Sequence, residues 1–271
     1  YYCMWFIGLN GIITWTAIRN LKDVMFLFLL VSLIYYLLDF FMNRKWSIFR
    51  IVLIVGICYV LQDIRQWFLY LFAGMIVIGI GGVLLKKRKY FLAISLAAVS
   101  VILLLSFYSR GLSTMLLYRV AYSETQSTVL GGDAITGLIN GGLLSLPMSM
   151  ARFILGPGPI RGLFGSEAFL TYTQTGNVLI FLGGMAWWIF LPLFIMSLFS
   201  IKHFKQRYMI LAVLLFYWAT YSFAYAGSGD TRLRVILYVL CAMYTIPYIS
   251  DYWKKKYIVS YVALLVPLCL I

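Results

Sequence analysis

The residues best suited to chemistry are arginines and acids that lie outside the long apolar runs of this chain. The richest stretch is segment 109–176, which carries four arginines and three acids: Arg110, Arg119, Arg152, Arg161, Glu124, Asp133 and Glu167. A guanidinium is planar, always charged and able to form paired hydrogen bonds to phosphate. The pattern therefore predicts a site for a pyrophosphate or another anion. Pairing of the arginines with nearby acids and lipid phosphates is the alternative.

Two further groups of charges flank apolar runs. Arg19 and Asp23 are four residues apart, so on a helix they share one face beside Lys22. Arg19 and Asp23 form an ion pair at the end of a helix, or Asp23 is a functional acid that Arg19 and Lys22 hold at the bilayer edge. Arg232 and Arg234 follow glycines at the start of a late apolar run, where a helix N-terminus favours anions. Pairing with Asp230 is the alternative there. For Asp63 and Arg65 we favour a structural turn.

Acids in these segments are candidates for a general base. Glu124 and Asp133 are the acids in the first half of segment 109–176. One of them could accept a proton if burial or neighbouring charges adjust its pKa. The alternative for Glu124 and Asp133 is that they neutralise Arg110 and Arg119. Polar residues and terminal glycines predict a loop over 123–132.

A short apolar piece interrupts the long polar segment. Residues 141–155 begin with glycines and include Pro147, and the run Gly156-Pro157-Gly158-Pro159 follows them. An apolar segment this short is more often re-entrant or interfacial than transmembrane. A hairpin bent at the Gly-Pro run would bring Arg152 and Arg161 to one level. A hairpin that only packs on the helix bundle is the other interpretation.

Composition determines the class of protein. Hydrophobic residues make up 63% of the chain and charged residues 11%, and short basic stretches separate the apolar runs. This indicates an all-α, polytopic bundle of transmembrane helices. We predict about nine spans, at residues 2–18, 24–42, 46–61, 67–85, 90–108, 177–200, 209–225, 235–250 and 257–271. Because the chain begins and ends inside apolar runs, we expect it to be a fragment that lacks N-terminal spans of the protein.

The loops predict orientation and organisation. Lysine-rich stretches at 43–45, 86–89, 202–207 and 254–256 fall on one side, which the positive-inside rule assigns to the cytoplasm. On the opposite side the basic residues are arginines apart from Lys22. The predicted parts are five N-terminal helices at 1–108, an outward-facing loop with a re-entrant or interfacial helix at 109–176, and four C-terminal helices at 177–271.

Other chemistries find little support. Cys3, Cys58, Cys241 and Cys269 lie within apolar runs and are expected to be buried structural thiols. His203 lies between Lys202 and Lys205, and we interpret it as a solvated interfacial residue. These residues form no metal-binding pattern, so we predict neither a metal nor a cofactor. A hydrolase is also disfavoured, because no nucleophile motif is present.

Three stretches give the chain a family resemblance. They are 17–23 with Arg19 and Asp23, 151–159 with Arg152 and the Gly-Pro run, and 229–234 with Arg232 and Arg234. Because of their order along the chain and their predicted position on the same side of the membrane, these stretches resemble the polytopic glycan polymerases of the O-antigen, capsule and exopolysaccharide type. More loosely, they resemble GT-C-like lipid-linked glycosyltransferases.

The resemblance implies an activity. Such an enzyme joins undecaprenyl-diphosphate-linked oligosaccharide repeat units at the outer face of the bacterial plasma membrane, and it is a metal-independent glycosyltransferase. The expected partners are the polyprenyl-diphosphate-linked oligosaccharide, membrane lipids, a chain-length regulator and a flippase, with no nucleic acid. Catalytic roles would fall to Asp23 and Glu124. The diphosphate would be bound by Arg19, Arg110, Arg119, Arg152, Arg161, Arg232 and Arg234.

Two alternatives remain open. A transporter or flippase for lipid-linked oligosaccharide would also need outward arginines and an apolar lateral gate, and such proteins often contain broken helices in related halves. A non-catalytic membrane subunit of a polysaccharide assembly would use its arginines only to tie down the long loop.

Overall fold

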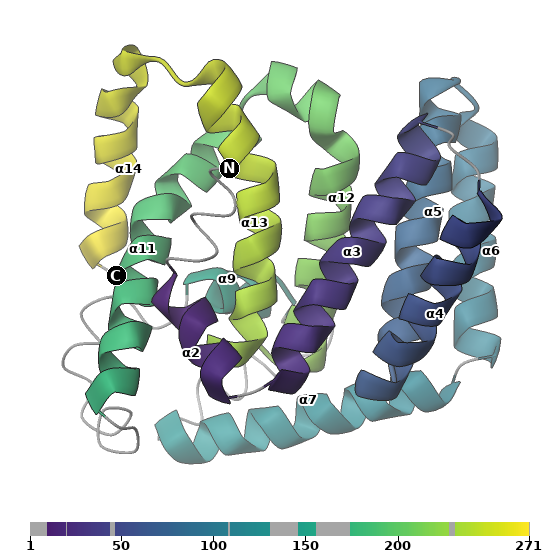
Figure 1. The fold of residues 1–271 in the computed structure, drawn as a ribbon, viewed down its shortest axis with the longest axis horizontal. Coiled ribbons are helices and arrows are strands. Elements are labelled where there is room, and N and C mark those ends of the chain that lie inside the picture. Colours follow the sequence, from purple (N-terminus) through teal and green to yellow (C-terminus); the bar gives the residue numbers. More distant parts are fainter. Residues whose placement is uncertain are drawn as a thin grey trace. The chain divides into compact units, whose positions relative to one another are not determined.

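The computed structural model describes residues 10–19, 21–43, 47–107, 109–130, 146–155, 174–227 and 231–270, and these parts contain helices and turns but no strands (Figure 1). The prediction of an all-α chain is therefore confirmed for them. The helices are α2 (Gly11–Arg19), α3 (Leu21–Asn43), α4 (Ile48–Ile64), α5 (Phe68–Lys86), α6 (Tyr90–Phe107), α7 (Ser109–Leu130), α9 (Leu146–Leu155), α11 (Gln174–Leu198), α12 (Ile201–Ala224), α13 (Thr231–Tyr252), the 3-10 turn η2 (Lys255–Tyr257) and α14 (Ile258–Leu270).

Five of the described helices are long and apolar enough to cross a membrane. The apolar windows lie at Lys22–Phe40, Phe68–Leu85, Val178–Leu198, Arg207–Ala224 and Leu233–Tyr252. On α4, Ile48, Val52, Val55 and Tyr59 are exposed at helical spacing, as expected of a face in contact with lipid. These features are compatible with a multi-pass membrane protein, and the number of nine spans stays a prediction.

Helix α2 begins in the middle of the span predicted at 2–18. Asn10 Oδ1 accepts hydrogen bonds from the backbone N–H groups of Ile12 and Ile13, at 3.0 and 3.2 Å. This is an N-cap, which satisfies backbone donors that a helix start leaves unpaired. Among the described residues the helix therefore starts at Gly11, and the span at 2–18 stays a prediction.

Helix α7 extends into a stretch that was predicted to be a loop. The loop expected at 123–132 is instead helical as far as Leu130. Between Gly111 and Leu130 the sequence contains neither glycine nor proline, so no residue in this stretch breaks the helix. In Figure 1, α7 runs across the ends of α4 and α5. The apolar piece at 141–155 contributes α9, with Pro147 in the first turn, where its missing N–H costs little. Whether this piece enters the membrane stays a prediction.

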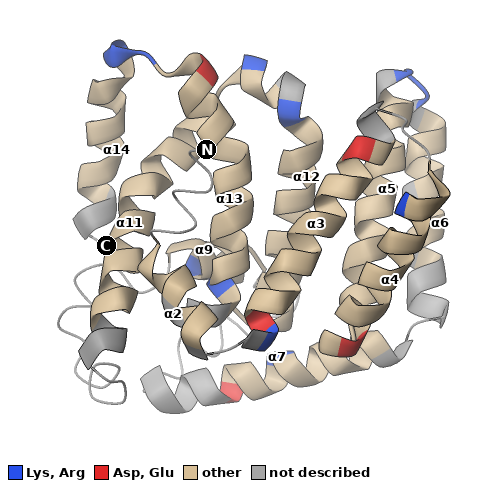
Figure 2. Cartoon of the chain, in the orientation of Figure 1, with Lys and Arg blue, Asp and Glu red and all other residues tan. Residues whose placement is uncertain are grey.

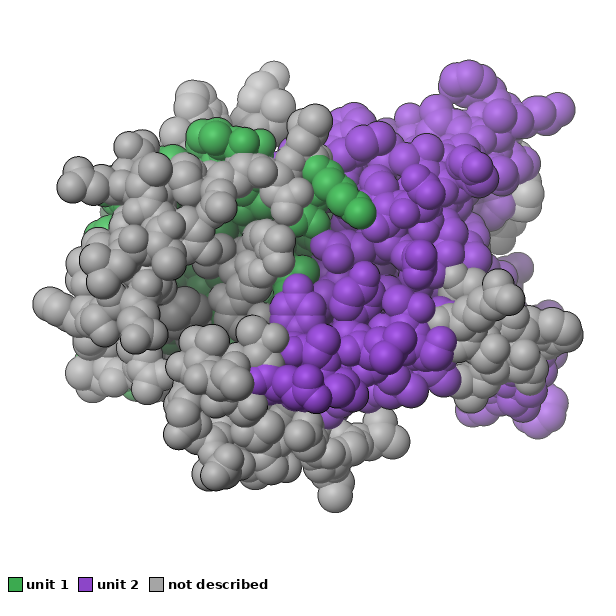
Figure 3. Space-filling model, turned by 90° about the horizontal axis from the view of Figure 1, so that it is seen from below, with its two compact units in different colours: residues 1–23, 151–214, 229–271 green, residues 24–150, 215–228 purple. Residues whose placement is uncertain are grey.

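The chain forms two compact units, which Figure 3 colours separately. Unit 1 comprises Tyr1–Asp23, Ala151–Leu214 and Gly229–Ile271, and in it α11 packs against α2, α13 and α14. Unit 2 comprises Val24–Met150 and Leu215–Ser228, and in it α5 packs against α4, α6 and α7. Each unit is thus assembled from segments that are far apart in the sequence.

Two prolines inside helices of unit 1 are accommodated in the same way. Proline lacks an N–H and its ring disturbs the carbonyls one turn earlier, so Pro192 in α11 and Pro247 in α13 weaken the backbone ladder. The carbonyl three residues before each proline receives a side-chain hydrogen bond from another helix. Tyr261 Oη donates to Ile189 O at 2.9 Å, and His203 Nε2 lies 2.8 Å from Tyr244 O. Neighbouring helices thus satisfy backbone groups at the prolines.

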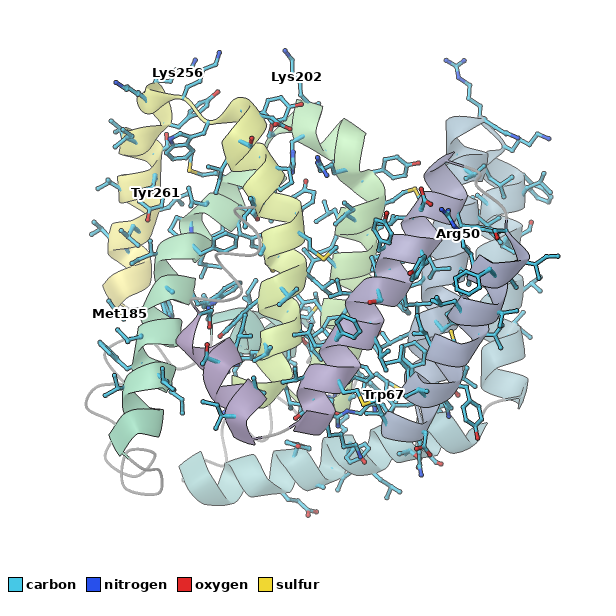
Figure 4. All side chains as sticks on the ribbon, in the orientation of Figure 1. Arg50, Trp67, Met185, Lys202, Lys256 and Tyr261 are labelled. Atoms are coloured by element: carbon cyan, nitrogen blue, oxygen red, sulfur yellow. The ribbon has the colours of Figure 1, made fainter. Side chains whose placement is uncertain are left out.

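The middles of α11 and α5 carry no charged residue (Figure 2). Within unit 1, Lys202 and Lys256 lie at the same end, as Figure 4 shows. This agrees with the prediction that the loops at 202–207 and 254–256 share a side. Within unit 2, Arg50 pairs with Asp39. Of the four cysteines, Cys58 and Cys241 are buried free thiols, as predicted, and the side chains of the other two lie outside the described residues.

Candidate functional site

The first candidate site, in unit 1, is a set of residues that we call the Arg234 cluster: Arg152, Ile154, Trp187, Arg234 and Tyr238. Arg234 is only 1% exposed, and its Nη2 donates to Arg152 O at 3.5 Å. Trp187 Nε1 donates to Ile154 O at 2.9 Å. The Trp187 ring stacks on Tyr238 with centroids 4.1 Å apart. Three helices, α9, α11 and α13, therefore meet through specific polar contacts.

These contacts explain how α9 is held. The last carbonyls of a helix have no partner within it, and a cation is favoured there by the helix dipole. Arg234 and Trp187 supply donors to two of these carbonyls. Phe153, fully buried, anchors the same turn by apolar packing. The arrangement fixes the backbone at Arg152, whose own side chain is half-buried and so retains access to a ligand.

The electrostatics of the Arg234 cluster favour an anion. Arg234 lies in the first turn of α13, where the N-terminal end of the helix dipole adds positive potential, and its guanidinium contacts the backbone of a second arginine, Arg152. The first turn of α13 contains no acidic residue. Asp23, which is 6% exposed, belongs to the same unit and follows α2, the helix that packs on α13. Unit 1 thus combines two arginines with one buried acid.

A second candidate site, in unit 2, is built around Tyr225. We define the Tyr225 cluster as Arg65, Trp67, Tyr118, Tyr122, Tyr221 and Tyr225. Arg65 Nη1 donates to Tyr225 Oη at 2.8 Å. The rings of Tyr118 and Tyr122 lie 5.8 and 5.0 Å from that of Tyr225. Residues from the 62–66 turn, from α7 and from the end of α12 therefore converge. The first two of these segments were predicted to face outward, and the third lies at the end of the span predicted at 209–225.

Arg119 lies beside this cluster and has a structural task. Its Nη1 donates to Phe223 O at 3.1 Å, and its guanidinium lies 4.7 Å from the centre of the Phe223 ring. Phe223 O belongs to the last turn of α12, which ends in left-handed residues Ala226 and Gly227. Burial lowers the pKa of the Arg119 guanidinium below its ordinary value. Arg119 thus caps α12, an interpretation that the sequence did not single out.

The structure places the predicted site residues in both units. In unit 1 it brings Arg152 and Arg234 together and buries Asp23. In unit 2 it buries Arg119 and leaves Glu124 exposed on α7. Arg161 lies outside the described residues. Three more arginines are placed by their backbone in α2, α7 and α13, but their side chains are not described: Arg19, Arg110 and Arg232.

Sequence reasoning missed the role of Arg65, which it assigned to a simple turn. One signal was available: Tyr217, Tyr221 and Tyr225 recur every fourth residue, which places them on one face of a helix. Tyrosine in an apolar stripe carries hydroxyls that need partners, so the repeat indicates a polar contact. That Arg65 supplies the contact could not be inferred, because it lies 160 residues away.

The prediction that His203 is solvated is wrong, because its side chain is fully buried. The rings of Tyr244, Tyr248 and Tyr252 surround it at centroid distances of 4.6, 5.6 and 5.8 Å. A carbonyl only accepts, so the bond to Tyr244 O requires a proton on Nε2. Burial lowers the pKa of His203, the bond to Tyr244 and nearby Asp251 oppose that effect, and Arg207 reinforces it.

Comparison with known proteins adds no assignment: no family model matches the sequence, and neither a curated protein nor a solved structure does. The class of protein therefore rests on the chain itself. It is a helical protein with several long apolar helices, compatible with multi-pass insertion, and it holds buried arginines in both compact units.

Proposed function

We propose that the chain is a glycan polymerase-like glycosyltransferase that joins polyprenyl-diphosphate-linked oligosaccharides at the outer face of the bacterial plasma membrane. The observation that carries the proposal is the contact of Arg234 with Arg152 in unit 1. The three stretches that resemble the polymerase family, at 17–23, 151–159 and 229–234, all fall within the segments of that unit. A single site built from these three stretches requires that they lie in the same unit.

The proposed chemistry is glycosyl transfer without a metal. The acceptor hydroxyl oxygen forms a bond to the anomeric carbon of the donor sugar while the bond from that carbon to the diphosphate oxygen breaks. Arg152 and Arg234 stabilise the negative charge that develops on the departing polyprenyl diphosphate. A carboxylate takes the acceptor proton. Asp23 is favoured over Glu124 for this step because it is buried in the unit that holds both arginines.

Charge-preserving substitutions test the proposal. Arg152→Lys and Arg234→Lys keep a cation but remove the fork that binds two phosphate oxygens at once. We expect polymer to fall roughly tenfold or more, equivalent to at least about 1.4 kcal/mol of lost transition-state stabilisation. Single lipid-linked repeat units should accumulate on the outer leaflet. The measurement is polysaccharide chain length and lipid-linked intermediates in cells, with protein abundance determined in parallel.

Arg88→Lys is the matched control, because Arg88 is exposed in the turn between α5 and α6, on the predicted inner side. It should leave polymer length unchanged. Normal polymer in both Arg152→Lys and Arg234→Lys, or a loss that only follows abundance, would mean that these arginines are structural, and the proposal would be wrong.

One observation favours the transporter alternative. Helix α2 starts at a buried N-cap inside an apolar run, and helix N-termini at membrane depth bind the substrate in many transporters. A transporter defect would leave lipid-linked units on the inner leaflet. The leaflet in which the intermediates of Arg152→Lys and Arg234→Lys accumulate therefore separates the two functions.

A further inference from the structure

The Tyr225 cluster presents both aromatic rings and polar groups at the surface of unit 2. Tyr118 is 39% exposed, and Tyr122 and Arg65 are half-buried. Asp63 and Gln66, in the same turn as Arg65, are exposed. Tyrosine combines a flat apolar face with a hydroxyl, whereas guanidinium, carboxylate and amide groups bond hydroxyls in one plane. Such a set matches a sugar, which has apolar C–H faces and a rim of hydroxyls.

Arg65 is held rigidly for a binding role. The Gln62 side chain bridges its turn: Nε2 donates to Gln66 O at 2.6 Å, and Oε1 accepts from Leu69 N at 3.2 Å. The guanidinium lies 5.9 Å from the centre of the Phe26 ring and 5.7 Å from that of Tyr225. Fixing a polar group before the ligand arrives reduces the entropy lost on binding.

Beneath the surface, three polar atoms near the end of α12 are buried without a hydrogen-bond partner in the described part of the chain: Trp67 Nε1, Ser149 Oγ and Ser222 Oγ. The Trp67 ring packs edge-on against Tyr221 and Tyr225, at 5.0 and 6.0 Å. A side chain at Gly227 would press on the backbone of Ser149. Unpartnered buried polar atoms are rare in native proteins. Because Trp67, Ser149 and Ser222 are 0% exposed, these atoms lie behind the surface that a sugar would contact.

We propose that the Tyr225 cluster is a glycan-binding subsite that holds an uncharged, polyhydroxylated sugar against Tyr118 and Arg65. We take the sugar to be the oligosaccharide of a lipid-linked repeat unit, and this identification rests on the proposed function. The subsite differs from the Arg234 cluster in chemistry, because only Arg65 contributes a full positive charge and the remaining members are aromatic. It binds the glycan, whereas the Arg234 cluster binds the diphosphate.

The test is direct binding to the full chain in lipid nanodiscs. The probe is the neutral oligosaccharide that mild acid releases from the lipid-linked fraction of the producing cells, measured by isothermal titration. Tyr118→Ala removes the exposed ring, and Arg65→Lys keeps the charge but loses the planar fork. We expect each to weaken binding roughly tenfold, as loss of an anchoring contact does.

Tyr59→Ala is the matched control, because Tyr59 is a 78% exposed tyrosine on α4 of the same unit. It should bind as the wild type does. Tyr118→Phe, which keeps the ring, should retain most of the affinity, and melting temperatures show whether each variant is folded. If Arg65→Lys does not fold, Tyr118→Ala alone decides the result.

Absence of binding by the wild-type chain, or unchanged binding by Tyr118→Ala, would overturn the proposal. A different result would contradict the proposed function. Normal polymer in the arginine variants of the Arg234 cluster would exclude that function, yet it would leave the titration with oligosaccharide as it stands. Conversely, Arg234→Lys should bind the neutral oligosaccharide normally, since that probe carries no diphosphate.

Discussion

Gly183→Ala should lower the free energy of unfolding by about 3 kcal/mol, toward the upper end of the range for overpacked sites. A Cβ at Gly183 would overlap Ile12 N and would lie 2.6 Å from Ile12 Cγ1 and 2.9 Å from Asn10 Oδ1. It would therefore push α2 away from α11 and disturb the N-cap at once. Small residues allow such close helix crossings in membranes. Thermal and denaturant unfolding of the purified chain would measure the loss.

Gly184→Ala is the matched control at the next residue of α11. A Cβ there meets nothing within 4 Å. Because alanine is favoured over glycine inside a helix by about 1 kcal/mol, this change should be neutral or stabilising. Gly11→Ala should resemble Gly183→Ala, since its Cβ would overlap Leu179 O. Equal effects at positions 183 and 184 would show that α2 and α11 do not cross at these glycines.

The sequence predicted the apolar helices well, because their signal is local. Runs such as 67–85 and 235–250 coincide with α5 and α13 to within a few residues, since length and hydropathy alone define them. The start of α2 was missed for a non-local reason. An asparagine within an apolar run gives no sign that it caps a helix, and the crossing of Gly11 with Gly183 becomes visible only in the folded chain.

The sequence drew attention to the arginines outside the apolar runs, and the structure brings Arg234 into contact with the backbone of Arg152. That these arginines bind an anion stays a prediction. The sequence could not show that Arg119 caps α12 or that Arg234 caps α9, because each accepting carbonyl lies far along the chain. A guanidinium has five N–H donors, so a structural bond leaves others for a ligand. The two roles are therefore compatible.

His203→Phe should destabilise the chain by about 1 to 3 kcal/mol at pH 8, the usual cost of leaving a buried polar group unsatisfied. Phenylalanine fills much of the same space among Tyr244, Tyr248 and Tyr252, but it cannot donate to the Tyr244 carbonyl near Pro247. His203→Gln retains an N–H donor and should lose less. Melting temperatures of the two variants and the wild type in nanodiscs would measure the difference. Equal stability of His203→Phe and the wild type would exclude the role at Pro247.

The same variants predict a dependence on pH. Burial lowers the pKa of His203 in the folded chain, with Arg207 acting in the same direction and Asp251 opposing it. The unfolded state therefore binds a proton more readily, starting near its ordinary pKa of about 6.5. The stabilising contribution of neutral His203 is complete above that pH and declines as the pH falls toward the folded pKa. Between pH 8 and pH 5.5 the wild type should consequently lose more stability than His203→Gln, which does not titrate. An identical loss in both chains would show that His203 does not control the acid sensitivity of unit 1.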